Sequence, residues 1–142
     1  METKIDYVYN TAFVLENETK VSKWLAQAAM KEGFSVGEVV YAFFNDEDLK
    51  SLNNKHLNHD YFTDVISFND SKGTVLNGNI AISIDRVREN AERYKATFND
   101  ELLRVMVHGL LHFMGYDDSS DKETLLMRDK EDDNLKMFHV EQ

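Results

Sequence analysis

Apolar residues follow two different spacings along this chain. Residues 5–9, 38–44, 64–68 and 78–83 are rich in β-branched and aromatic side chains, which is typical of strands. Elsewhere apolar residues recur three and four positions apart, which predicts helices at 21–31, 46–53, 85–94, 101–114 and 121–138. Strands interleaved with helices, with one hairpin, predict an α+β fold in which about five helices pack on a small four-stranded mixed sheet.

Glycine and asparagine supply the breaks between these elements, since the chain has no proline. Gly33 and Gly115 follow predicted helices and are expected to end them. Asn45-Asp46 and Asn99-Asp100 precede predicted helices and are expected to cap them. The 142 residues show no repeat, linker or low-complexity stretch, so we expect a single domain over residues 1–142.

The helix predicted at 101–114 carries one polar stripe. Apolar residues lie on nearly every other side, so we expect the helix to be buried. Arg104, His108 and His112 recur every four residues and lie above one another. Two imidazoles one turn apart can reach a single metal ion. A third ligand must come from beyond the helix, and Gly115 allows the chain to turn back, because glycine readily adopts a left-handed conformation.

A carboxylate follows this turn at the right place to be the third ligand. Asp118 stands three residues after Gly115, with Asp117 beside it. The spacing favours a metal site over a pair of structural histidines, which is the alternative. Three ligands with an open position are typical of catalytic zinc, and nickel, iron and manganese are further alternatives. Thiolate ligation is excluded, since the chain has no cysteine.

The charge of the chain is strongly negative, at −10. This argues against non-specific binding to nucleic acid, which uses a broad basic surface. A protein of this composition that acts on RNA needs a local basic site, a metal or a partner that brings the substrate. The acidic helix at 121–138 is expected to be a solvated face. No secretory signal or membrane-length apolar run is visible, so we expect a cytoplasmic protein without a membrane partner.

Three motifs occur in a fixed order between about residues 38 and 138. The first is Leu52-Asn53 followed by Thr63-Asp-Val-Ile-Ser-Phe68, and the second is Gly78-Asn-Ile-Ala-Ile-Ser83. The third is His108-Gly-Leu-Leu-His112-Phe-Met-Gly-Tyr-Asp-Asp118. In residue identity and spacing, the three motifs resemble those of the YbeY family of bacterial endoribonucleases, the rRNA maturation factors. The third motif of that family reads His-Gly-x-Leu-His-x-x-Gly-Tyr-Asp-His.

The resemblance implies a zinc-dependent, single-strand-specific endoribonuclease with an α+β fold and one zinc per chain. It implies that His108 and His112 ligate the zinc. It also implies a role in small-subunit rRNA maturation and in ribosome quality control. The partners implied are rRNA and the small ribosomal subunit or its assembly proteins.

The chain departs from the family pattern at two positions. Asp118 stands where the family has its third ligand, a histidine, and carboxylate oxygen binds zinc at similar distances. Leu57 stands where the family usually has an arginine. A cation beside the metal offsets charge that builds on phosphoryl oxygens during cleavage. The candidates to replace that cation are Lys55, His56, His59 and Arg104.

Arg104 and Asp64 are the candidate catalytic residues beside the metal. Arg104 either points from the histidine stripe toward the cleft or pairs with Asp100 or Glu101 at the start of its helix. Asp64 either caps a turn or orients a ligating histidine, as carboxylates around metal sites do.

Two other functions compete with RNA cleavage. The first is a non-catalytic ribosome-assembly factor with a structural metal, which is favoured by Leu57 and by the net charge of −10. The second is a metallopeptidase. It is disfavoured because His-Glu-x-x-His peptidases carry their general base directly after the first histidine, where this chain has Gly109.

Overall fold

The computed structural model describes residues 3–58 and 62–140, which form four strands and five helices. In chain order these are β1 (Lys4–Tyr9), α1 (Glu18–Lys31), β2 (Ser35–Phe44), α2 (Asp46–Leu57), β3 (Val65–Asn69), β4 (Val75–Ser83), α3 (Ile84–Arg93), α4 (Phe98–Phe113) and α5 (Asp121–Val140). The strands form one sheet in the order β1-β2-β4-β3. Strands β1, β2 and β4 are parallel, and β3 runs antiparallel to β4. The predicted α+β fold with a four-stranded mixed sheet is confirmed.

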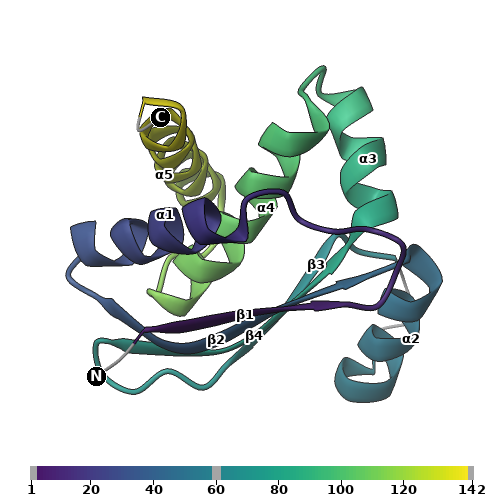
Figure 1. Cartoon of the computed structure of the whole chain (residues 1–142), viewed down its shortest axis with the longest axis horizontal. Helices are drawn as coiled ribbons and strands as arrows, with labels where there is room; N and C mark the ends of the chain where they lie inside the picture. The colour runs from purple at the N-terminus through teal and green to yellow at the C-terminus, as the bar shows by residue number, and fades with distance from the viewer. Residues whose placement is uncertain (1–2, 59–61, 141–142) are drawn as a thin grey trace.

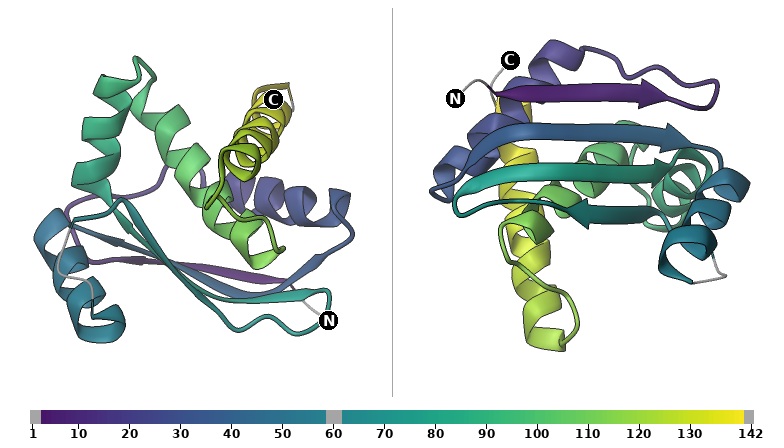
Figure 2. Two further views of the ribbon diagram at one scale, coloured as in Figure 1. Left: turned by 180° about the vertical axis from the view of Figure 1, so that it is seen from behind. Right: turned by 90° about the horizontal axis from the view of Figure 1, so that it is seen from below.

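The helices cover the two faces of the sheet unequally. Helices α1, α4 and α5 lie over one face, whereas α2 lies at one end on the other side (Figure 1). Seen from below, the sheet stands in front of α1, α4 and α5, and β3 forms one of its edges (Figure 2, right). Within residues 3–58 and 62–140, no helix is both long and apolar enough to cross a membrane.

Helix α4 packs closely on the sheet because one of its residues has no side chain. A Cβ atom added at Gly109 would lie 2.9 Å from Cγ2 of Ile80 on β4. The Tyr41 hydroxyl of β2 donates a hydrogen bond of 2.8 Å to the Met106 carbonyl. These contacts turn one side of α4 to β4. His108 and His112 lie on another side, toward the β3 edge, where they line a cavity with β3 residues.

Several element boundaries differ from the sequence prediction. Strands β2 and β4 begin three residues earlier, and α2 continues to Leu57. The cap of α4 is Thr97, whose hydroxyl accepts the Asp100 N–H at 3.0 Å, and not Asn99-Asp100. The helix begins earlier because Phe98 packs against the core, with its ring 5.8 Å from that of Phe13. The predicted cap at Asn45 is confirmed, since its side chain accepts the Asp48 N–H.

The prediction that the acidic helix is a solvated face is wrong for one side of α5. That side is buried and consists of Met127, Glu131, Asn134 and Leu135. The Asn134 carbonyl accepts a hydrogen bond of 2.7 Å from the Trp24 indole N–H of α1. The sequence prediction gave weight to the many acidic residues of this helix. It therefore missed the buried stripe at helical spacing, through which α5 packs against its neighbours.

Candidate metal centre

The end of α4 turns the chain back toward its own histidines. Gly115 has φ of +101°, which a residue with a Cβ rarely adopts. Its N–H donates to the His112 carbonyl at 3.0 Å, and the Tyr116 N–H donates to the Leu111 carbonyl at 3.1 Å. This pair of bonds is the Schellman arrangement that closes a helix. The turn brings Asp118 beside the imidazoles, as the sequence predicted.

Three side chains converge at this point. His108 Nε2 and His112 Nε2 lie 3.0 Å apart. The Asp118 Oδ2 atom lies 3.4 Å from His108 Nε2 and 3.6 Å from His112 Nε2. In the described part of the chain, these residues are the group of His, Asp and Glu found to offer one ligand atom each within 4.8 Å.

The spacing of these atoms fits a small tetrahedral ion. Zinc bonds to imidazole and carboxylate of about 2.0–2.2 Å place tetrahedral ligand atoms about 3.3–3.6 Å apart. The two separations that involve Asp118, 3.4 and 3.6 Å, lie in that range, and the 3.0 Å between the two imidazole nitrogens is slightly shorter. Asp117 faces its own loop instead, since its Oδ1 accepts the Asp118 N–H at 2.8 Å. The donor set and its geometry are therefore suited to zinc.

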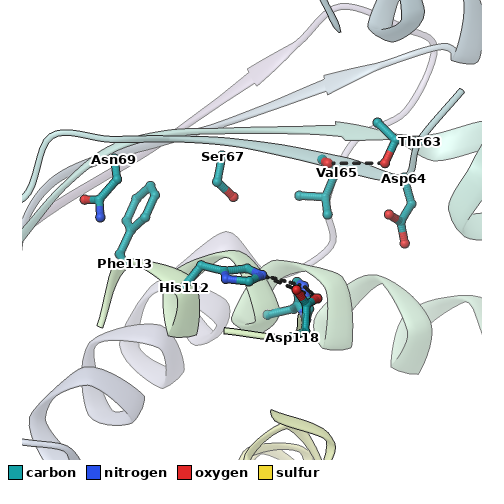
Figure 3. A pocket seen from close by; sticks show the side chains of 9 residues that line it. Thr63, Asp64, Val65, Ser67, Asn69, His112, Phe113 and Asp118 are labelled. Atoms are coloured by element: carbon teal, nitrogen blue, oxygen red, sulfur yellow. Dashed lines mark hydrogen bonds and ion pairs between the residues drawn. The ribbon is translucent and has the colours of Figure 1, made fainter. Parts of the chain in front are cut away.

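The cluster lies in a cavity between β3 and α4. The cavity has a volume of about 460 Å³ and is lined by Thr63, Asp64, Val65, Ser67, Asn69, His108, His112, Phe113 and Asp118. Alternate residues of a strand face the same side, so Val65, Ser67 and Asn69 all face α4. Figure 3 shows Ser67 and Asn69 on the β3 side, across from His112. One wall thus offers polar side chains, and the other offers the candidate ligands.

Asp64 lines this cavity without bonding to either histidine. Its Oδ2 accepts a hydrogen bond of 3.3 Å from the Asn90 side chain of α3. Burial raises the pKa of the Asp64 carboxyl, and the charge of His108 offsets only part of that effect. Asp64 is therefore a carboxyl group that holds its proton more readily than usual at the edge of the cavity.

Arg104 does not line the cavity that holds the cluster. Its guanidinium donates to Glu131 Oε1 and to Asp132 Oδ1 of α5, each at 2.9 Å. Its Nε lies 4.0 Å from Glu101, one of the two partners that the sequence suggested. Arg104 instead lines a smaller cavity of about 140 Å³ on the other side of His108.

The other candidate cations also lie elsewhere. No lysine or arginine is among the residues found to line the 460 Å³ cavity in the described chain. Leu57 is 40% exposed at the end of α2 and is not a lining residue. His56 lines a separate apolar cavity under α2, and Lys55 is exposed in the same helix. His59 lies outside the described residues.

Glu131 is a functional candidate that the sequence analysis missed. Its Oε2 atom lies 2.7 Å from His108 Nδ1, and its side chain is only 5% exposed. A signal was present, because Glu131 stands four residues from both Met127 and Leu135, which are buried on α5. An acid in the middle of such a stripe must be buried, and buried acids need partners.

Opposite charges couple His108 and Glu131. Burial lowers the pKa of His108, but the hydrogen bond and charge of Glu131, with the charges of Asp118 and Asp64, outweigh it and raise the net value. Burial raises the pKa of Glu131, but the bonds from His108 and Arg104 outweigh it and hold the net value below its usual range. In the metal-free protein the pair therefore favours imidazolium beside carboxylate.

We expect this pair to make the stability of the metal-free protein depend on pH. A raised histidine pKa contributes stability that is fully present below the unfolded value of 6.5 and is lost as pH rises through the folded value. Urea unfolding in chelator should therefore show the free-energy difference between wild type and His108→Gln shrinking from about pH 6 to about pH 9. A difference that grows over this range would contradict the pairing.

The position after the first histidine argues against the peptidase alternative. Gly109 faces Ile80 on the sheet. A glutamate at this position would point into the core and not at the cluster. The structure therefore offers no place for the general base of a His-Glu-x-x-His peptidase.

Comparison with known proteins gives consistent matches. The family model described as Endoribonuclease YbeY matches residues 7–139. A Flavobacterium psychrophilum protein named Endoribonuclease YbeY is 49% identical over 138 residues, covering 97% of this chain and 99% of the relative. A Cytophaga hutchinsonii protein of the same name is 44% identical and is covered over 96% of its length. The solution structure of TM1509 from Thermotoga maritima matches with a TM-score of 0.67 at 27% identity, covering 96% of this chain and 90% of that one.

Proposed function

This chain belongs to the endoribonuclease YbeY family, and from that premise we propose that it is a zinc-dependent enzyme that cuts single-stranded small-subunit rRNA in ribosome maturation and quality control. It is a nuclease that hydrolyses RNA phosphodiester bonds. The observation that carries the zinc dependence is the convergence of His108, His112 and Asp118 in one cavity. One such cluster in the described chain corresponds to one zinc per molecule.

The three candidate ligands would hold the ion through one atom each. His108 and His112 would each present a neutral Nε2 atom, and Asp118 would present Oδ2. Three protein ligands leave a coordination position open, which is the pattern of catalytic sites. A bound zinc supplies activation of water and neutralisation of charge on phosphoryl oxygens. Because Asp118 is anionic where the family has histidine, the site carries one unit less positive charge.

The shape of the cavity supports action on single strands. A volume of about 460 Å³ lies low in the range of roughly 300–1,000 Å³ for small-molecule sites. This suits one or two nucleotides that are unstacked from a helix. The Ser67 hydroxyl and the Asn69 side chain face the cavity, where they can bond a ribose or a phosphate. Such contacts position RNA without reading its sequence.

Asp64 is the candidate for proton transfer. It lines the cavity, and burial raises the pKa of its carboxyl, so at a given pH it carries a proton more often than an exposed aspartate and can donate it. We propose that Asp64 exchanges a proton with the attacking or leaving oxygen. Arg104 donates its hydrogen bonds to Glu131 and Asp132 of α5, so we propose that any effect it has on cleavage acts through Glu131.

The negative charge of the protein implies that a partner must bring the RNA to the site. The net charge is −10, and no lysine or arginine belongs to the described lining of the cavity. Affinity for free RNA therefore depends mainly on the metal, with few phosphate contacts. We propose that the small ribosomal subunit or its assembly proteins present the rRNA to the enzyme.

We expect zinc to restore cleavage to metal-free protein. One equivalent of zinc should restore cutting of a single-stranded fragment of small-subunit rRNA, whereas a duplex of the same sequence should resist. The reason is that the cluster offers ligand atoms for one ion, and that a cavity of about 460 Å³ suits unpaired nucleotides better than a duplex. Gel analysis of the products checks both parts. Equal cutting of both substrates would contradict the strand preference, and cutting by stripped protein without zinc would contradict the metal dependence.

Two neighbouring aspartates provide the matched control for the ligand assignment. Asp118→Ala should weaken zinc binding by roughly a hundredfold or more, because losing a ligand costs more than the tenfold to hundredfold of losing an outer partner. Asp117→Ala should change it little, and Asp118→His should retain it. Competition with a chromogenic chelator measures the affinities. The opposite order for the two alanine variants would assign the third ligand to Asp117.

A further inference from the structure

The second ring nitrogen of His108 faces away from the cluster and toward α5. While Nε2 lies among the candidate ligands, Nδ1 lies 2.7 Å from Glu131 Oε2. An ionised carboxylate can only accept hydrogen bonds, so the proton in this bond must be on Nδ1. When the ring is neutral, as a metal ligand must be, it carries one N–H only, and that N–H is on Nδ1. The Nε2 atom of the neutral ring therefore keeps a lone pair, directed at His112 and Asp118.

The Glu131 carboxylate is itself held in place. Its other oxygen, Oε1, accepts a hydrogen bond of 2.9 Å from Arg104 and lies 3.7 Å from the Arg128 guanidinium. Arg104 in turn bonds Asp132 at 2.9 Å. With a side chain only 5% exposed, Glu131 has little access to water that could replace either partner. Each carboxylate oxygen thus has its own assigned donor.

Packing of α5 fixes the position from which Glu131 acts. The Trp24 indole of α1 donates to the Asn134 carbonyl, one turn beyond Glu131. Lys130 donates at 2.9 Å to Glu32, the C-cap residue directly after α1, and Tyr116, in the turn before Asp118, donates to the same carboxylate at 2.7 Å. One network therefore ties α5 to α1 and to the loop that carries the third candidate ligand.

We infer that Glu131 is a positioning residue of the metal centre, which fixes the Nδ1–H tautomer of His108 and is itself held by Arg104 and α5. This inference rests on the proposed function, since it assigns His108 Nε2 to a metal. Carboxylates that orient ligating histidines are a general feature of metal sites, and losing one typically costs tenfold to hundredfold in affinity. The acidic helix α5 is thereby part of the active site without facing the cavity.

Glu131→Gln is the sharpest variant because it reverses the bond. Arg104 can only donate, so the single amide oxygen of glutamine is expected to turn to Arg104. The amide NH2 group then faces His108 Nδ1, which must accept. The proton of the neutral ring moves to Nε2 and blocks the lone pair that the metal needs. We expect zinc affinity, measured by chelator competition, to fall about tenfold to hundredfold.

Asp132→Asn is the matched control. Asp132 neighbours Glu131 on α5 and also accepts a bond from Arg104, but it makes no contact with His108 that the structure records. This variant removes one negative charge from the same region. Its zinc affinity should stay within about threefold of wild type, because no bond to the ring is changed. Equal losses in the two variants would show a general effect of charge and overturn the assignment.

A spectroscopic measurement tests the inference without any metal. In chelator, at a pH where His108 is neutral, long-range nitrogen-15 correlation spectra distinguish the two ring tautomers. Wild type and Asp132→Asn should show Nδ1–H at His108, and Glu131→Gln should show Nε2–H. A purely structural role for Glu131 would not invert the tautomer. Wild type with Nε2–H at His108 would overturn the inference, whether or not the variant folds.

The same experiments separate this inference from the proposed function. If the wild-type protein binds no zinc, the metal dependence of the proposed function fails, while the tautomer of the metal-free protein still decides whether Glu131 orients His108. If zinc binds and Glu131→Gln binds it as tightly as wild type, the inference fails and the proposed zinc site stands.

Discussion

His112→Ala is expected to lower the rate of RNA cleavage by about a thousandfold or more. This corresponds to roughly 4 kcal/mol of transition-state stabilisation, within the several kcal/mol that a catalytic metal supplies. The contacts recorded for the His112 side chain are with His108 and Asp118, so its removal opens the cluster without leaving a buried charge unpaired. Single-turnover cleavage of a single-stranded rRNA fragment at saturating zinc measures the effect.

A histidine outside the cluster provides the control. His139 lies near the end of α5, where its ring bonds the exposed Asp100 at 2.8 Å. His139→Ala should cleave within about threefold of wild type, because the residue is remote from the cavity. His108→Ala should match His112→Ala in activity but lose more stability, since it leaves Glu131 buried without its imidazole partner. Cleavage near the wild-type rate by the metal-free His112→Ala variant would show that the metal has no role in the reaction.

The parts of the site that are local in sequence could be predicted from it. His108 and His112 share a helix face because they stand four residues apart, and this follows from helix geometry alone. Gly115 predicted a turn that returns the chain, and the Schellman bonds at Gly115 and Tyr116 confirm that turn. Within the predicted strand 64–68, Val65 and Ser67 face one side by alternation, whereas Asn69 lay just beyond the predicted end of that strand. Each of these features depends on neighbours within a few positions.

The parts that depend on distant segments could not be predicted in the same way. The sequence suggested only partners in the same helix for Arg104, namely Asp100 and Glu101. Its shortest contacts are instead with Glu131 and Asp132, which lie 27 and 28 positions away on α5. A residue spacing cannot show which segment docks beside a helix. For α5, the many acidic residues led to the prediction of a solvated helix, and the buried stripe around Glu131 was missed. The sequence therefore located the candidate ligands but not the side chains that orient them.

Gly78 connects the sheet to the site through a close approach that only glycine permits. It lies on β4, opposite Val39 of β2 and Asn69 of β3. Its φ is +151°, outside the range that side-chain-bearing residues favour. A Cβ atom at this position would collide with the Phe68 carbonyl oxygen and would lie 2.8 Å from the Phe113 ring. Phe113 directly follows His112 and lines the same cavity.

Gly78→Ala is therefore expected to destabilise the protein by about 2–5 kcal/mol, which sums the cost of overpacking and of an unfavourable backbone conformation. The carbonyl belongs to the paired strand β3 and cannot move without breaking the ladder, so the sheet itself must shift. Gly73→Ala is the matched control, because Gly73 has φ of +59° but open space around it. That variant should lose only about 1–2 kcal/mol, from the left-handed backbone alone. Urea unfolding of both variants measures the difference, and equal losses would show that the contacts with Phe68 and Phe113 do not restrict this position.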